Sequence, residues 1–260
     1  MTQLTQFAYV QTRLQARHGL RPTEYTWNHL ASQNELASYL QSARRSALRP
    51  WVLSLHVNDN YHTMEALLIH QYRLYIQEIA FWLTSPWREI VLWIKRLPDL
   101  PALQHLLMGN TAALWMLNDP QLKPFTNSNM EQRIEALRQS DCGPLVDGWQ
   151  NGSSLVDAWL VHWHSLLSEQ KPKFTHSINS LVQLLKTHVE NFHHLNVSQT
   201  WNARTDLTNK LTFLFRRHPF EPVAAIVHLA LVALDLERLR ADIMQRAVFG
   251  SIKTDVKESA

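Results

Sequence analysis

Two stretches of this chain share one pattern of acidic and apolar residues. The first runs from Asp99 to Gly109 and the second from Asp235 to Met244. In each, a Leu directly follows the opening Asp, and apolar residues then recur at intervals of three and four, the spacing of one face of an α-helix. Each stretch also follows a longer helical segment and a joint that contains Pro. A repeat of this kind favours stacked helical units over one large globule and, without a catalytic cluster, a scaffold over an enzyme.

The composition and the local patterns predict an all-α fold. Only 6 of the 260 residues are Gly, 10 are Trp and 45% are hydrophobic, which is typical of long helices that pack on each other. Alternating runs of β-branched residues, the usual signal of strands, are missing. Helical spacing predicts helices over residues 4–19, 34–48, 63–83, 87–97, 100–108, 130–138, 154–167, 177–195, 204–217 and 221–248.

Gly, Pro and Asn residues divide these helices into units. We expect Gly19 and Gly250 to end helices, and Thr23, after Pro22, to cap the next one. The segment 110–129 holds two Pro and several Asn and marks a boundary. We therefore predict an array of repeated helical units: a first unit over residues 1–110, one or more units over residues 111–250, and a polar tail over residues 251–260.

The charge pattern argues against nucleic acid as the partner. The formal net charge is only +3, and Lys and Arg are interspersed with acidic residues rather than gathered in one tract. Arg13, Arg17, Arg44 and Arg45 form either a basic face for an acidic partner surface or an ordinary solvated helix face.

Three features bear on the location of the protein. The N-terminal segment has no basic stretch followed by an uninterrupted apolar run, so we expect no secretory signal. The most apolar run, residues 223–236, is shorter than the roughly 20 residues that cross a bilayer, and we expect it to form a fully buried helix. The single Cys142 excludes an intrachain disulfide and fits a reducing compartment. We therefore expect a cytoplasmic protein that does not span the membrane, and these features leave docking on a membrane complex open.

Several histidines have the chemistry of metal ligands. Two groups have suitable neighbours: His56, Asp59 and His62 in a polar loop, and Glu190, His193 and His194 on one helical face. We favour a loop that caps the helix beginning near residue 63, and a surface Glu–His pair. His162 and His164 lie on different sides of one helix and cannot share an ion.

Catalytic motifs are missing from the sequence. It contains no Walker A loop, Gly-rich dinucleotide loop, HExxH motif or Gly-x-Ser-x-Gly elbow. Cys142 has no base beside it in the sequence, so we favour an inert thiol over a nucleophile. We therefore expect no catalytic, cofactor-binding or metal-binding residues, and the alternative enzyme is a His-rich helical metalloenzyme.

The order of the motifs resembles the C (or d) subunit of archaeal-type and vacuolar-type rotary ATPases. That family opens with a Tyr followed by spaced Arg residues, matched here by Tyr9, Arg13 and Arg17, and residues 25–30 and 34–40 are similar to its next helices. Its most recognisable element is an acidic-x-x-Asn-Leu-basic segment near the end of each helical unit. Two sets of residues resemble it: Asp99, Leu103, Gln104, Leu107 and Gly109, and Asp235, Leu239, Arg240 and Ile243. Ala102 and Arg238 stand where the family has Asn.

The resemblance implies a funnel-like array of helical units that forms a non-catalytic subunit without a cofactor. In the family, this subunit lies on the cytoplasmic face of the membrane rotor ring and receives the foot of the central stalk. Torque passes through it between ATP turnover and ion transport. The expected partners are therefore the rotor ring and the central-stalk subunits. The alternative is a generic α-helical adaptor of another complex.

Overall fold

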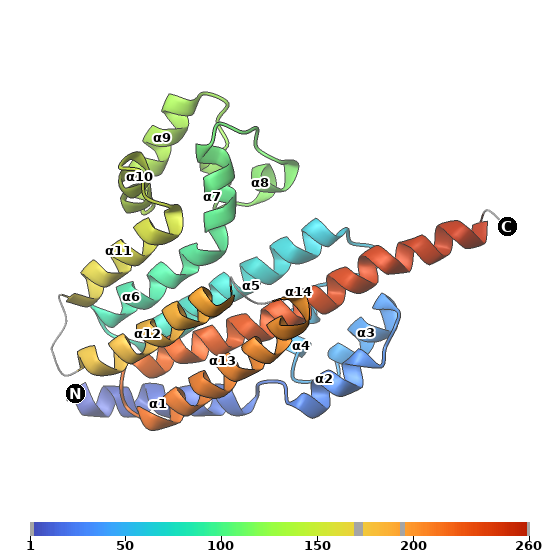
Figure 1. The fold of residues 1–260 in the computed structure, drawn as a ribbon, viewed down its shortest axis with the longest axis horizontal. Coiled ribbons are helices and arrows are strands. Elements are labelled where there is room, and N and C mark those ends of the chain that lie inside the picture. The colour runs from blue at the N-terminus through green and yellow to red at the C-terminus, as the bar shows by residue number, and fades with distance from the viewer. Residues whose placement is uncertain (1–2, 169–173, 193–195, 259–260) are drawn as a thin grey trace. The chain divides into compact units, whose positions relative to one another are not determined.

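The computed structural model describes residues 3–168, 174–192 and 196–258. Within these ranges every regular element is a helix and none is a strand, which confirms the predicted all-α class (Figure 1). Contacts divide the chain into two compact units: unit 1 combines residues 1–72 with 172–260, and unit 2 consists of residues 73–171. Helix α5 (Tyr61–Trp82) begins in unit 1 and ends in unit 2.

This division differs from the predicted boundary at residue 110. The N-terminal helices pack against the last helix of the chain, so the two ends of the sequence share one unit. Unit 1 contains, besides the start of α5, α1 (Gln3–Gly19), α2 (Glu24–Ala31), α3 (Leu36–Ala43), α4 (Arg49–Val52), α12 (Thr175–Phe192), α13 (Val197–Arg217) and α14 (Val223–Glu258).

Helix α14 is the central element of unit 1. Helices α1, α3, α12 and α13 each pack against it (Figure 1). All side chains from 223 to 229 are buried, whereas those at 230 and 233–236 are only partly buried, so the predicted full burial of the apolar run 223–236 holds only in part. Further along α14, Leu239 and Ile243 join a second apolar cluster with Leu30 of α2 and Tyr39 and Leu40 of α3.

Unit 2 contains the end of α5 and a series of shorter helices. They are α6 (Trp87–Trp93), the 3₁₀ helix η1 (Ile94–Asp99), α7 (Leu100–Leu107), α8 (Leu114–Asn118), the 3₁₀ helix η2 (Lys123–Phe125), α9 (Met130–Arg138), α10 (Gly143–Gln150) and α11 (Leu155–Ser168). Helix α11 packs against α10, α6 and α7. The contact of α10 with α11 requires Gly148, because an added Cβ there would lie 2.4 Å from the Cβ of Ala158.

Some helix ends follow the sequence signals and others do not. Helix α1 ends at Gly19, and the Thr23 side chain accepts a hydrogen bond from the Thr26 backbone N–H at 3.3 Å, as expected of an N-cap. Helix α14 does not end at Gly250 but continues to Glu258. A single Gly costs a helix only about 1 kcal/mol relative to Ala, and the residues after it include good helix formers.

The two similar sequence segments lie in different local structures. Asp99 ends η1 and stands at the N-cap of the short α7, whereas Asp235 lies inside the long α14. The predicted repeat of funnel-forming helical units is therefore not confirmed by the structure.

None of the helices in the described ranges has both the length and the apolar character that a membrane span requires.

Candidate functional site

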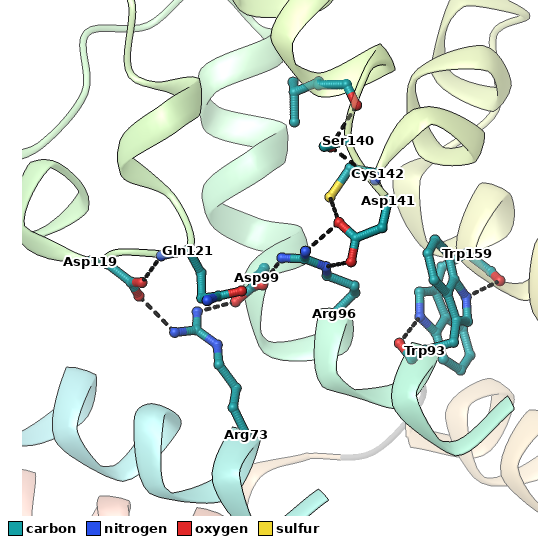
Figure 2. A network of polar contacts seen from close by, with 11 residues as sticks. Arg73, Trp93, Arg96, Asp99, Asp119, Gln121, Ser140, Asp141, Cys142 and Trp159 are labelled. Carbon is teal, nitrogen blue, oxygen red and sulfur yellow. Dashed lines mark hydrogen bonds and ion pairs between the residues drawn. The ribbon is translucent and has the colours of Figure 1, made fainter. Parts of the chain in front are cut away.

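A network of arginine and aspartate side chains lies inside unit 2 (Figure 2). Its centre is Asp99, the acidic residue of the first motif, whose side chain is almost fully buried. One carboxylate oxygen of Asp99 accepts a hydrogen bond from Arg73 of α5. The other accepts from Arg96 of η1 at 3.3 Å. One carboxylate therefore ties together two elements that each contribute an arginine.

Each arginine also binds a second aspartate. Arg73 donates from Nη1 to Asp119 Oδ2 at 2.9 Å, and the other oxygen of Asp119 accepts from the Gln121 backbone N–H at 2.8 Å. Arg96 forms a bidentate pair with Asp141, with its Nε donating at 3.2 Å and its Nη2 donating to the second oxygen. The network thus extends from α5 through η1 to the ends of α8 and α9.

The buried charges of the network balance. Arg73, Arg96, Asp99 and Asp119 are all buried, and they carry two positive and two negative charges. Burial raises the pKa of the Asp99 carboxyl, while the charges and hydrogen bonds of the two guanidinium groups oppose that increase. Asp141 has a largely exposed side chain and joins the network to solvent. Such a network fixes a geometry more than it adds net stability, because desolvation offsets much of the Coulomb attraction.

Cys142 lies at the edge of this network. Its thiol donates to Asp141 Oδ1 at 3.8 Å, and its backbone N–H donates to Ser140 Oγ at 3.0 Å (Figure 2). Burial raises the pKa of the Cys142 thiol to about 11. At neutral pH the thiol is therefore almost entirely protonated, which supports the interpretation as an inert cysteine.

The segment between α7 and α9 is fixed by a third buried arginine. Arg133 of α9 donates to the backbone carbonyl of Leu106, to that of Asn110 at 3.2 Å and to that of Asn127 at 3.0 Å. Together with Asp119 it fixes both ends and the middle of the stretch 110–129. This stretch, predicted as the boundary between halves, lies within unit 2 and is part of its structure.

Asp235, the acidic residue of the second motif, has an arginine partner in unit 1. Arg21 donates from Nε to Asp235 Oδ2 at 2.7 Å and from Nη2 to Oδ1 at 3.0 Å. Burial raises the pKa of Asp235, and the hydrogen bond and charge of Arg21 oppose the increase. Both motif aspartates are thus partly or fully buried and paired with arginine, although their helices differ.

Two further arginines of α14 lie over aromatic rings. The guanidinium of Arg238 is 4.7 Å from the ring centroid of Trp27, and that of Arg246 is 4.2 Å from the ring centroid of Tyr39. The Tyr39 hydroxyl donates to Asp242 at 3.1 Å, and burial raises the pKa of that hydroxyl. The polar side of α14 therefore holds α2 and α3 by specific contacts as well as by apolar packing.

The other residues of the predicted motifs have separate roles. Leu103 and Leu239 are fully buried in the cores of their units. Arg240 forms a surface ion pair with Glu65 at 2.8 Å. These residues hold helices together and do not converge on one site.

The opening motif lies on α1. The Arg13 guanidinium lies 4.9 Å from the ring centroid of the half-exposed Tyr9, and Arg17 follows one turn later. The charge of Arg17 is among the causes that lower the pKa of His228 on α14.

The two groups of residues that have the chemistry of metal ligands make ordinary local contacts or lie outside the described residues. Asp59 accepts from the His56 backbone N–H at 2.7 Å, and Asn60 accepts from the Thr63 backbone N–H at 2.9 Å, as in a loop that caps α5. His193 and His194 fall outside the described residues. Among the residues that are described, no three or more His, Cys, Asp or Glu side chains are arranged to hold a metal ion.

A pair of neighbouring histidines in unit 1, the half-buried His18 and the buried His228, was not recognised from the sequence. His18 of α1 stacks on Phe215 of α13 with ring centroids 4.4 Å apart, and His228 of α14 lies 6.1 Å from His18. Burial, with smaller contributions from nearby cationic groups, lowers the pKa of His18 to about 4 and that of His228 to about 3. Both rings are therefore neutral at pH 7. The interruption of an apolar run by His228 was the one available signal.

Comparisons with protein-family models, with curated proteins and with solved structures found no match to this chain.

The arginine–aspartate network was also missed in the sequence. Arg73 and Asp119 are 46 positions apart, and Arg96 and Asp141 are 45 positions apart. The only local signal was an arginine within an otherwise apolar helical stretch. Chemically, the network offers paired and hydrogen-bonded charges and a protonated thiol, an arrangement that serves to hold helices in fixed positions.

Proposed function

We propose that this chain is a non-catalytic subunit of a vacuolar- or archaeal-type ATPase that couples the membrane rotor ring to the central stalk. In this proposal it lies on the cytoplasmic side of the membrane complex. It carries torque between ATP turnover and ion transport and contributes no catalytic residue.

One observation carries the proposal. Asp99 and Asp235, the two acidic residues through which the sequence resembles the C (or d) subunit family, are both paired with arginine, Asp99 in a buried network and Asp235 at a partly buried position. A part that transmits torque must resist deformation, and the paired charges of the buried network connect several helices of unit 2, although Arg73 Nε has no hydrogen-bond partner among the described residues. The aromatic and ionic contacts of α14 support the same requirement in unit 1.

The proposal is tested by identifying what the protein binds in its own cell. The chain is tagged at its N-terminus and purified from native membranes in a mild detergent, and the recovered proteins are identified by mass spectrometry. We expect rotor-ring and central-stalk subunits in proportion to the tagged chain. Recovery without any ATPase subunit, or with a different helical complex, would overturn the proposal in favour of a generic adaptor.

A pair of variants makes this test specific to the folded protein. Asp99→Asn removes the central charge of the buried network, whereas Asp147→Asn changes an exposed carboxylate at the surface of the same unit. We expect Asp147→Asn to recover the same partners as the native chain. Asp99→Asn should recover less of them, in proportion to the loss of folded unit 2.

A further inference from the structure

The turn between α10 and α11 contains the only Asn-Gly pair of the sequence, Asn151 and Gly152. Both residues are exposed, as are Ser153 and Ser154 after them. Asn151 is the C-cap of α10, with φ −84° and ψ 10°, and Gly152 has a φ of +86°. The turn is therefore open to water, and its second residue has a backbone conformation that glycine adopts without strain.

The side chain of Asn151 is free to move. Among the described residues, none forms a hydrogen bond with its amide group. Asn127, another exposed asparagine, is held instead: its Nδ2 donates to Gln132 Oε1 at 2.7 Å, and its Oδ1 accepts from the Asn129 backbone N–H at 2.9 Å. Asn151 therefore combines exposure, a free amide group and a glycine as its next residue.

These three properties favour ring closure between neighbouring residues. The backbone nitrogen of Gly152 can close a five-membered ring with the side-chain carbonyl carbon of Asn151. A glycine has no Cβ to hinder this approach, and its backbone rotates freely. In the folded turn, the Gly152 N–H donates to the Trp149 carbonyl at 3.0 Å, so the last turn of α10 must open first. Helix ends open at a lower free energy than the core of a protein does.

We propose that Asn151 is a site of self-modification by deamidation. The Gly152 nitrogen loses its proton to water or hydroxide and attacks the side-chain carbonyl carbon of Asn151. A cyclic imide forms, and the side-chain nitrogen takes up a proton and leaves as ammonia. Water then attacks the side-chain carbonyl of the imide to give aspartate, or its main-chain carbonyl to give an isoaspartyl linkage. The net reaction consumes water, releases ammonia and needs no oxidant or reductant.

Both products disturb the joint between α10 and α11. A carboxylate at the C-cap lies at the negative end of the helix dipole, and Asp147 lies one turn before it. The isoaspartyl linkage also adds a methylene group to the main chain, close after Gly148. The contact there has no slack, because an added Cβ on Gly148 would lie 2.4 Å from the Cβ of Ala158. We therefore expect the modified turn to loosen α10 from α11.

The reaction is tested on the purified full-length chain during storage at neutral and at mildly alkaline pH. Peptide mapping by mass spectrometry measures the loss of each side-chain amide and separates the aspartyl from the isoaspartyl product. We expect Asn151 to lose its amide before any other asparagine does, and faster at the higher pH because the nucleophile is the deprotonated nitrogen. No loss at Asn151, or an earlier loss at another asparagine, would overturn the proposal.

Two variants test the reason for the reactivity. Asn151→Gln requires a six-membered ring, so residue 151 should keep its amide over the same period. Ser128→Gly places a glycine after Asn127, whose side chain is held by its two hydrogen bonds. In that variant we expect Asn127 to react more slowly than Asn151. Equal rates at the two sites would show that the following glycine alone sets the rate, and would overturn the role of the free side chain.

The structural consequence is measured by thermal unfolding. Asn151→Asp carries the new charge on an ordinary main chain and should lower the Tm slightly. Stored native chain enriched in the isoaspartyl product should have a lower Tm than this variant, whereas stored Asn151→Gln should keep the Tm of fresh protein. Equal Tm values for fresh and modified native chain would overturn the loosening of α10. These measurements involve no partner, so their outcome does not depend on the proposed coupling role.

Discussion

Trp93 and Trp159 each donate an indole hydrogen bond to the backbone carbonyl of the other, at 3.2 Å in both directions. Their rings lie 6.5 Å apart at an interplanar angle of 11°, and Figure 2 shows both hydrogen bonds. The pair joins α6 to α11, and Trp159 also stacks on Trp163 with centroids 5.5 Å apart. This reciprocal contact holds α6 against α11, while the arginine–aspartate network connects α5 and η1 to Asp119 and Asp141.

The tryptophan pair predicts a specific loss of stability. Trp159→Phe keeps an aromatic ring but removes the indole donor, so the Trp93 carbonyl loses the hydrogen bond that joins it to α11. We expect the free energy of unfolding of unit 2 to fall by about 1–3 kcal/mol. Urea denaturation followed by far-UV circular dichroism measures this change. Trp201→Phe, at a half-exposed position of α13, is the control and should change the free energy by less than about 0.5 kcal/mol.

The arginine–aspartate network predicts a larger effect. Asp99→Asn leaves Arg73 and Arg96 without their shared buried carboxylate, and we expect a loss of about 3–5 kcal/mol in the free energy of unfolding. Asp147→Asn, in an exposed pair with Arg138 at 3.8 Å, should cost less than about 1 kcal/mol. Equal losses of unfolding free energy in the two variants would show that the buried network contributes no more to stability than an exposed ion pair does.

These contacts explain how far the sequence predicts the structure. Local spacing was sufficient for α9, which runs from Met130 to Arg138 as predicted, because its N-cap Asn129 accepts hydrogen bonds from the Glu131 and Gln132 backbone N–H groups. It was not sufficient for the stretch 110–129. Polar residues there indicate a linker, but Asp119 lies in it and binds an arginine of α5.

The candidate site was predicted only in part. The motif acids Asp99 and Asp235 were identified in the sequence, but their partners Arg73 and Arg21 were not. Periodicity describes which face of a helix is apolar and carries no information about which distant helix supplies the opposite charge. The pairing of the first and last helices in unit 1, which overrides the predicted boundary, depends on the same long-range information.

The neighbouring histidines His18 and His228 predict a dependence of stability on pH. Because the folded-state pKa values of His18 and His228 are lowered to about 4 and about 3, the unfolded chain binds protons at higher pH than the folded chain does. Above pH ~6.5 both histidines are neutral in the folded and the unfolded chain, and the full stability is present. As the pH falls from ~6.5 toward 4 and 3, the unfolded chain takes up protons that the folded chain does not, and the free energy of unfolding decreases. Each contributes a slope of at most about 1.4 kcal/mol per pH unit in that window.

A variant isolates this contribution from that of the carboxylates. His228→Leu cannot be protonated, so its free energy of unfolding should fall less steeply than that of the native chain between pH 6 and about 4. His62→Gln, at an exposed position, should keep the native slope. If the free energy of unfolding has the same pH dependence in His228→Leu and in the native chain, the dependence does not arise from His18 and His228.

The environment of Cys142 predicts a slow reaction with alkylating agents. The thiol is fully buried and its pKa is raised to about 11, so little thiolate is present or accessible at pH 7. Iodoacetamide should label the native chain slowly and the urea-unfolded chain rapidly, as measured by mass spectrometry. Cys142→Ala with Ser153→Cys moves the thiol to an exposed position and should label rapidly without urea. Rapid labelling of native Cys142 would revive the nucleophile interpretation.

The coupling role is tested most directly by the ratio of ion transport to ATP hydrolysis in membrane vesicles from the native host. Vesicles are prepared from cells that lack this chain and from the same cells with the chain restored, and both proton and sodium uptake are followed on addition of ATP. We predict that ATP hydrolysis by the soluble head continues without the chain, while ATP-driven uptake of the transported ion is lost. Uptake should return when the chain is restored. Uptake and hydrolysis that are the same with and without the chain would contradict it.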